Sequence, residues 1–297
     1  TLTPQLQTDQ GQTCLLLVDL GRGKKRLAGS ALGQVYSRMQ GTAPDLDSPS
    51  DLIGLFNFIN NCRNEDLLLA YHDRSDGGLF TTLAEMAFAG HCGVDIQLQA
   101  LGAEDNVLAA LFNEELGAVV QVREKQLASV MKYADKNGLS ACVHEIAKLN
   151  DKGKISIALG ENVLFTQGRI ELQRQWAATS YHMQSMRDNS VCAHEEYDQL
   201  LDAADPGISI ELSFDLNEDI TAPYINVDAK PRIAVLREQG VNGQIEMGAV
   251  FDRARFEAID VHMTDLISGR GSLSQVNALV ACGGFSYGDV LGAGGGW

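Results

Sequence analysis

The segment Tyr71-His-Asp-Arg-Ser-Asp-Gly-Gly-Leu79 combines residue types that bind metal ions and phosphates, directly after an apolar run. The carboxylates of Asp73 and Asp76 are oxygen ligands of the kind Mg²⁺ prefers, and the Ser75 hydroxyl can donate to a phosphate oxygen. Gly77 and Gly78 let backbone N–H groups approach an anion at the start of a helix. For an isolated Ser-Asp-Gly a plain helix cap is the better interpretation. Because doubled acids and doubled glycines occur together here, the segment predicts a nucleotide or metal site.

A second segment, Asp19-Leu-Gly-Arg-Gly-Lys-Lys-Arg-Leu-Ala-Gly-Ser-Ala31, carries a cluster of positive charge. Its basic residues are Arg22, Lys24, Lys25 and Arg26. The segment has neither a Walker A ending nor the GxGxxG spacing of a dinucleotide-binding loop. Two interpretations stay open: a site for an anionic ligand or an acidic neighbouring domain, and a surface or docking loop in which Ser30 caps the next helix.

A third segment, Ala281-Cys-Gly-Gly-Phe-Ser-Tyr-Gly-Asp289, follows an apolar strand. The backbone N–H groups of Gly283, Gly284 and Phe285 are candidates for an anion-stabilising nest. Cys282 closes the strand and is not in a Gly-x-Cys-x-Gly turn, so we expect a buried, unreactive thiol. The scattered cysteines and histidines predict no disulfide and no structural zinc.

Apolar runs and helical patterns alternate around these segments, which predicts an α/β fold. The expected strands are 14–19, 67–72, 94–98, 118–122, 155–159, 232–237, 258–262 and 278–282. The expected helices are 31–39, 52–61, 79–89, 106–112, 124–137 and 244–255.

The length of 297 residues is typical of about two domains, and the composition is globular. A net charge of −16 argues against nucleic acid as a partner. The apolar runs are too short to cross a bilayer and no signal peptide is evident, so we expect a soluble, cytoplasmic chain. More than half of the net charge lies in residues 171–229, which reads as an acidic helical connector. The predicted domains are therefore 1–170 and 230–297, the second with too few elements to be complete.

These motifs, in this order, resemble those of the large phosphoribosylformylglycinamidine synthases of purine biosynthesis. The likeness extends over the segments 15–36, 67–95, 111–122, 231–247 and 279–297. It implies that 1–170 is the C-terminal α/β layer found in aminoimidazole ribonucleotide synthetase relatives. It also implies that 230–297 is the truncated start of a class I glutamine amidotransferase domain.

The resemblance implies an ATP-dependent C–N ligase that converts formylglycinamide ribonucleotide, glutamine and ATP to formylglycinamidine ribonucleotide, glutamate, ADP and phosphate. It assigns Asp73 to Mg²⁺ and Ser75 to ATP. From their residue types, Asp76, Gly77 and Gly78 are candidates for additional nucleotide-site residues. The resemblance assigns Gly283, Gly284 and Phe285 to the oxyanion and glutamine loop.

The glutaminase Cys, His and Glu of the family have no counterpart before Trp297, so no catalytic residue is predicted here and the chain alone is expected to be inactive. The expected partners are the small-molecule ligands and the remaining domains of the same polypeptide. The chain departs from the family pattern at Ala28, Arg255 and Gly295. The alternative function is a structural nucleotide-binding or docking module of the same enzyme, without catalysis.

Overall fold

The protein forms two compact units, Thr1–Gly207 and Ile208–Trp297, in a computed structural model that describes residues 2–205, 207–208, 210–219 and 230–296. Part of the predicted connector, 220–229, and the terminal Trp297 therefore lie outside the described residues. Within the described ranges, no helix is both long enough and apolar enough to span a bilayer.

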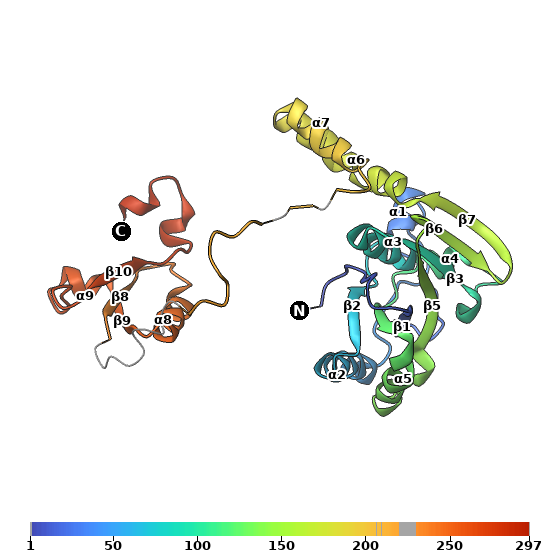
Figure 1. Ribbon diagram of the computed structural model, residues 1–297, viewed down its shortest axis with the longest axis horizontal. Coiled ribbons are helices and arrows are strands. Elements are labelled where there is room, and N and C mark those ends of the chain that lie inside the picture. Colours follow the sequence, from blue (N-terminus) through green and yellow to red (C-terminus); the bar gives the residue numbers. More distant parts are fainter. Residues whose placement is uncertain (1, 206, 209, 220–229, 297) are drawn as a thin grey trace. The chain divides into compact units, whose positions relative to one another are not determined.

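The first unit contains a mixed seven-stranded sheet in the order β2-β4-β1-β5-β3-β6-β7 (Figure 1). Its strands are β1 (Thr13–Asp19), β2 (Leu68–Asp73), β3 (Gly93–Gln97), β4 (Gly117–Arg123), β5 (Val143–Asn150), β6 (Lys154–Leu159) and β7 (Asn162–Gly168). Neighbouring strands are antiparallel except for β3 and β6, which pair in parallel. The five strands predicted here are confirmed. The sequence analysis missed β5 and β7 because charged or exposed residues interrupt their apolar pattern.

The helices of this unit are α1 (Ala31–Val35), α2 (Pro49–Asn64), α3 (Gly78–Gly90), α4 (Val107–Phe112), α5 (Leu127–Lys136), α6 (Arg169–Arg187) and α7 (Ser190–Gln199). The prediction that the first helix extends to residue 39 is wrong. Helix α1 ends early because Ser37 adopts a left-handed φ of 53° and the Arg38 N–H donates to the Gly33 carbonyl.

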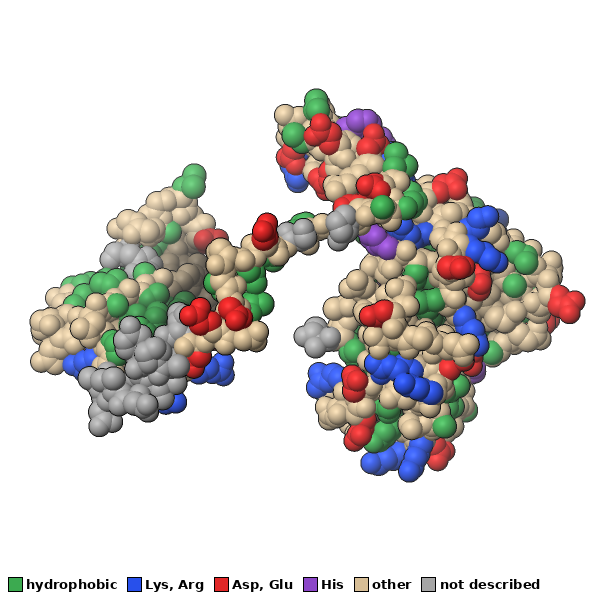
Figure 2. Space-filling view, viewed as in Figure 1, with side chains coloured by type: hydrophobic (Ala, Val, Ile, Leu, Met, Phe, Trp, Pro, Cys, Tyr) green, Lys and Arg blue, Asp and Glu red, His purple; other side chains and the backbone are tan. Residues whose placement is uncertain are grey.

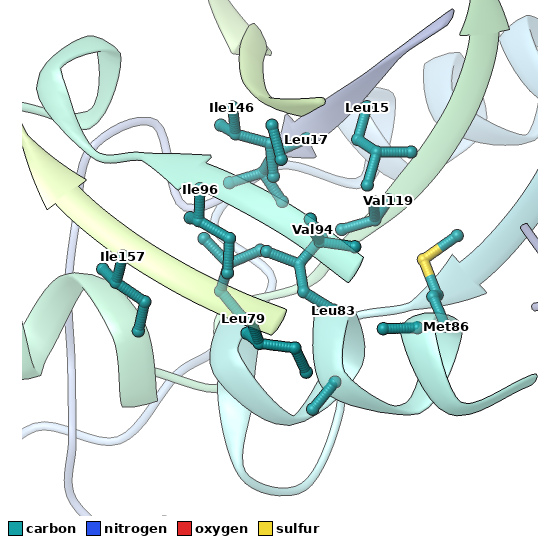
Figure 3. Close-up of a cluster of buried hydrophobic side chains, with 14 of the residues drawn as sticks. Leu15, Leu17, Leu79, Leu83, Met86, Val94, Ile96, Val119, Ile146 and Ile157 are labelled. Carbon is teal, nitrogen blue, oxygen red and sulfur yellow. The ribbon is translucent and has the colours of Figure 1, made fainter. Parts of the chain in front are cut away.

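Helices cover both faces of the sheet. Leu15 and Leu17 of β1 pack with Leu79, Leu83 and Met86 of α3 (Figure 3). The alternate residues of β1 pack on the opposite face, against α2 and α5; they are Cys14, Leu16 and Val18. Every residue of β1 is therefore buried, which explains its unbroken apolar run.

The first part of the predicted connector is a helical pair that belongs to the first unit. Trp176 of α6 lies 6.0 Å from Phe88 of α3 between ring centroids, and its indole N–H donates to Glu85. Tyr181 of α6 stacks on Tyr197 of α7 at 4.3 Å. The unit consequently extends to Gly207, beyond the boundary at 170 that the composition indicates, because aromatic packing attaches α6 to α3.

The second unit has a parallel three-stranded sheet in the order β10-β8-β9, with β8 (Arg232–Arg237), β9 (Glu257–His262) and β10 (Ala278–Ala281). Its helices are α8 (Gln244–Arg253) and α9 (Met263–Ile267). The central strand β8 is buried from Ile233 to Leu236. The predicted strands and the helix α8 are confirmed.

Arg255 ends α8 in a conformation that favours glycine. Its φ is 67°, its N–H donates to the Asp252 carbonyl, and the Phe256 N–H donates to Phe251. These are the two hydrogen bonds of a Schellman motif, and the rings of Phe251 and Phe256 lie 5.4 Å apart as its apolar contact. The left-handed geometry that would make a non-glycine residue costly here is therefore present.

Replacing Arg255 by glycine is expected to stabilise the second unit by about 0.5–1 kcal/mol, because the strain of a left-handed side chain disappears while the unfolded chain gains some freedom. Amide hydrogen exchange of β8 measures the change. The control Arg253→Gly makes the same replacement inside the helix and should destabilise the unit by about 1 kcal/mol. If both variants changed the stability of the second unit in the same direction, the strain argument would be contradicted.

Candidate functional site

Three strand ends meet at one edge of the first sheet. In the antiparallel register Asp19, at the end of β1, pairs with Gly117 at the start of β4, and Asp73, at the end of β2, pairs with Ala118. The structure thus brings together the segments 19–31 and 71–79 that the sequence analysis identified separately.

A buried ion pair joins these two segments. Arg74 is 5% exposed, and its Nη2 donates to Asp19 Oδ1 at 2.6 Å while its Nε donates to the Glu115 carbonyl at 2.6 Å. Asp19 also accepts the N–H groups of Gly21 and Gly23. Because these charged atoms have partners, the ion pair and its hydrogen bonds offset the desolvation penalty of burying both charges. Asp19, Arg74 and the Glu115 carbonyl thus form a rigid support beneath both loops, which is called the base below.

Two glutamates between α4 and β4 complete this base. The fully buried Glu115 accepts three hydrogen bonds from Arg26: from its N–H at 3.0 Å and its Nε at 2.7 Å to Oε1, and from its Nη2 at 2.6 Å to Oε2. Glu114 Oε1 accepts the N–H groups of Gly77 and Ala31, both at 2.8 Å. Neither residue was predicted from the sequence. The available signal was a pair of acids placed between a helix and a buried strand.

The basic segment is neutralised within the first unit. Arg22 pairs with Asp51 at 2.7 Å and Lys24 pairs with Asp47 at 2.7 Å. Hydrogen bonds from these basic groups hold the pKa of each aspartate below its usual range. Lys25 donates to the Gly102 carbonyl. Figure 2 shows acidic and basic side chains interspersed on the visible face of this unit. These partners favour the docking-loop interpretation, and Ser30 caps α1 as that interpretation requires.

The candidate nucleotide residues lie on the exposed side of this base. Asp73, Ser75 and Asp76 are exposed, and Asp73 Oδ1 accepts a hydrogen bond from the Tyr71 hydroxyl at 2.5 Å. Burial and this contact raise the pKa of Tyr71. The described part of the chain has no group of three or more His, Cys, Asp or Glu residues placed to hold a metal ion. One carboxylate is nonetheless a normal protein contribution to Mg²⁺, since phosphates and water supply its other ligands.

Gly77 and Gly78 are held in left-handed conformations by hydrogen bonds within the first unit. Their φ values are 83° and 67°, and their N–H groups donate to Glu114 and to the Ser75 carbonyl. Both groups are therefore already bonded, and the structure does not support the expectation that they approach an anion. A Cβ at Gly78 would lie 2.6 Å from the Asn113 carbonyl oxygen, so this position requires glycine on steric grounds.

The glycine loop of the second unit packs against the loop after β8. The Phe285 N–H donates to the Gly240 carbonyl at 2.9 Å, and Gly284 pairs with Val241. The Phe285 N–H is therefore not available to an anion, whereas the roles of Gly283 and Gly284 stay predictions. Cys282 is buried, and burial raises its thiol pKa, as expected of an unreactive cysteine.

Two protein families match separate parts of the chain. Residues 26–160 match the AIR synthase related protein C-terminal domain. Residues 230–297 match the CobB/CobQ-like glutamine amidotransferase domain. The two matches support the phosphoribosylformylglycinamidine synthase resemblance. They also agree with the predicted fold class of an α/β layer followed by an amidotransferase-type unit.

Several solved structures are similar to part of the chain. T. maritima PurL complexed with ATP is 12% identical with a TM-score of 0.45, over 57% of this chain and 26% of that chain. T. maritima PurL complexed with FGAR is 11% identical with a TM-score of 0.45, over 58% and 29%. E. coli HypE, a hydrogenase maturation protein, is 18% identical with a TM-score of 0.40, over 57% and 51%. The chain thus spans about a quarter of the PurL structures it matches.

Proposed function

We propose that this chain is part of an ATP-dependent amidoligase of purine biosynthesis, which forms formylglycinamidine ribonucleotide with glutamine as the nitrogen donor. The observation that carries the proposal is the presence, in one polypeptide, of an AIR synthase related domain followed by a glutamine amidotransferase domain. The PurL structures complexed with ATP and with FGAR name ligands of the kind this reaction requires.

The proposed chemistry gives the residues at the sheet edge separate tasks. Phosphorylation of the amide oxygen of formylglycinamide ribonucleotide would create a leaving group that ammonia displaces. In this proposal Ser75 contacts ATP and Asp73 contributes one carboxylate to Mg²⁺, with Asp76 beside them. Mg²⁺, when bound, would neutralise phosphate charge. Arg74, anchored to Asp19 in the base, fixes the backbone between Asp73 and Ser75.

The second candidate function is a structural nucleotide-binding or docking module of the same enzyme. The internal bonding of the Gly77 and Gly78 N–H groups favours it, because these groups hold the fold together instead of facing a ligand. The two functions differ in what they require of the exposed Asp73 carboxylate. A structural site needs it for stability, whereas a catalytic site needs it for turnover.

Replacing Asp73 by asparagine in the full-length enzyme is expected to lower kcat/KM for amidine formation by about 100-fold, because a carboxylate that would hold the phosphate-neutralising Mg²⁺ is lost. The fold should be unchanged, since the Asp73 side chain is exposed. ATP-dependent product formation and circular dichroism measure the two effects.

Asp76→Asn is the matched control, because it makes the same change of charge three residues away. We expect it to retain turnover within about tenfold, consistent with a supporting contact. Near-normal turnover of Asp73→Asn together with a lowered thermal midpoint would instead establish the structural module.

A further inference from the structure

Arg169, the first residue of α6, is a buried cation without an acidic partner among the described residues. It is 5% exposed, and the hydrogen bond its guanidinium makes within the described ranges runs from Nη1 to the neutral Gln173 Oε1 at 2.6 Å. The buried Arg74 and the half-buried Arg26 of this unit each pair with a carboxylate. Since buried charges in proteins are normally paired, Arg169 has an unmet requirement for negative charge.

Arg169 lines a cavity of about 1110 Å³. Segment 8–13, the start of β3, the turn between β5 and β6 and the start of α6 form its walls. This volume is sufficient for a small-molecule ligand, for which pockets of about 300–1,000 Å³ are typical. The cavity is separate from the candidate nucleotide site, because neither Asp73 nor the loop that follows it is among its lining residues.

The helix geometry adds to the demand for an anion. The 19-residue α6 begins at Arg169, and its N-cap, Gly168, has no side chain that could cap the first turn. The positive end of the helix dipole therefore lies at the residue that carries the guanidinium. The acid of the first turn, Glu171, is exposed and forms no ion pair with Arg169 in the structure as described.

The acidic residues of the cavity have other contacts or lie in solvent. Asp95 accepts a hydrogen bond from Asn150, and Glu124 pairs with Lys148 at 2.6 Å. Asp151 is exposed in the turn between β5 and β6. Burial lowers the pKa of Arg169, as expected of a cation that has lost water without gaining a counter-ion.

We propose that this cavity binds a small molecule bearing an oxyanion, with its carboxylate or phosphate group hydrogen-bonded to Arg169. A guanidinium presents two parallel N–H groups that fit either oxyanion. Lys152, which also lines the cavity, carries an ammonium group that is an additional hydrogen-bond donor. The proposal does not depend on the proposed function.

The test titrates the 297-residue chain with inorganic phosphate and, separately, with acetate, against sodium chloride at equal ionic strength. We expect one of the two oxyanions to raise the thermal midpoint of the first unit saturably. A response to phosphate assigns a phosphorylated ligand, and a response to acetate assigns a carboxylate ligand. No response beyond that of chloride overturns the proposal.

Arg169→Met should weaken the binding at least tenfold. The control Arg187→Met, which removes an exposed arginine of the same helix that pairs with Asp188, should bind as the unmodified chain does. Binding that persists in Arg169→Met overturns the proposal.

The stability of the chain, measured without any oxyanion, is an independent test. Arg169→Met should then be at least as stable as the unmodified chain in urea, because a buried charge without a counter-ion has been removed. A clear loss of stability would show that Gln173 already satisfies Arg169, and it would overturn the proposal.

Discussion

Gly78→Ala is expected to destabilise the first unit by about 3 kcal/mol or more, from two costs that add. A residue with a side chain at a φ of 67° costs about 1–2 kcal/mol. The new Cβ would also lie 2.6 Å from the Asn113 carbonyl oxygen and 2.8 Å from that of Leu111. Backbone atoms cannot move aside as a flexible side chain can, and overpacking of this kind costs about 1–3 kcal/mol. The loop that carries Asp73 and Ser75 would be displaced.

Gly138→Ala is the matched control. Gly138 has a similar φ of 72°, but a Cβ there would meet no atom within 4 Å. It should therefore cost about 1 kcal/mol, from backbone strain alone. Urea unfolding followed by Trp176 fluorescence, in a Trp297→Phe background, compares the two variants. Equal losses of unfolding free energy in the two variants would refute the steric argument at Gly78.

Glu115→Gln should lower the free energy of unfolding of the first unit by about 3 kcal/mol, because it leaves the Arg26 guanidinium without its buried counter-ion. The Glu115 side chain is fully buried and that of Arg26 is 12% exposed. An amide can accept only on one of its two atoms, so the bond from Nη2 to Oε2 would become a contact between two donors.

Asp47→Asn makes the same acid-to-amide change at the other carboxylate that contacts Arg26. Asp47 is 39% exposed, so water screens its ion pairs and we expect a loss below about 1 kcal/mol. Urea unfolding at low and high salt separates the two cases, because only the exposed pairs should weaken with salt. A loss at Asp47 as large as that at Glu115 would contradict the role of burial.

The base beneath the candidate site shows why part of it was not predictable from the sequence. The strands that end at Asp19 and Asp73 are apolar runs followed by polar residues, and such runs mark buried strands wherever they pair. Glu114 and Glu115 are recognisable in the sequence only as a pair of acids between a helix and a buried strand, and that pattern does not identify their partners. Their partners Gly77 and Arg26 lie 37 and 89 positions away, and only the order of strands in the sheet places them in contact.

The burial of Arg169 was also not predictable from the sequence. In the sequence it is an arginine beside an acidic stretch, where a solvated ion pair is the natural expectation. In the fold the start of α6 lies against the turn between β5 and β6, and the Arg169 N–H donates to the Gly153 carbonyl. The Arg169 side chain is buried, and no acid among the described residues pairs with it. Burial depends on which segments pack together, and composition does not specify that.

The sequence by itself determined most of the strands and helices and the position of each candidate motif after a strand. These properties depend on residues that are close together in the chain, through the period of apolar residues and the limits on φ. The tertiary structure decided that the basic segment is paired within its own unit, that Glu114 and Glu115 hold the two loops, and that Arg169 faces a cavity. Each of these depends on charges brought together from distant positions, whose energies are fixed by burial and by the distance between partners.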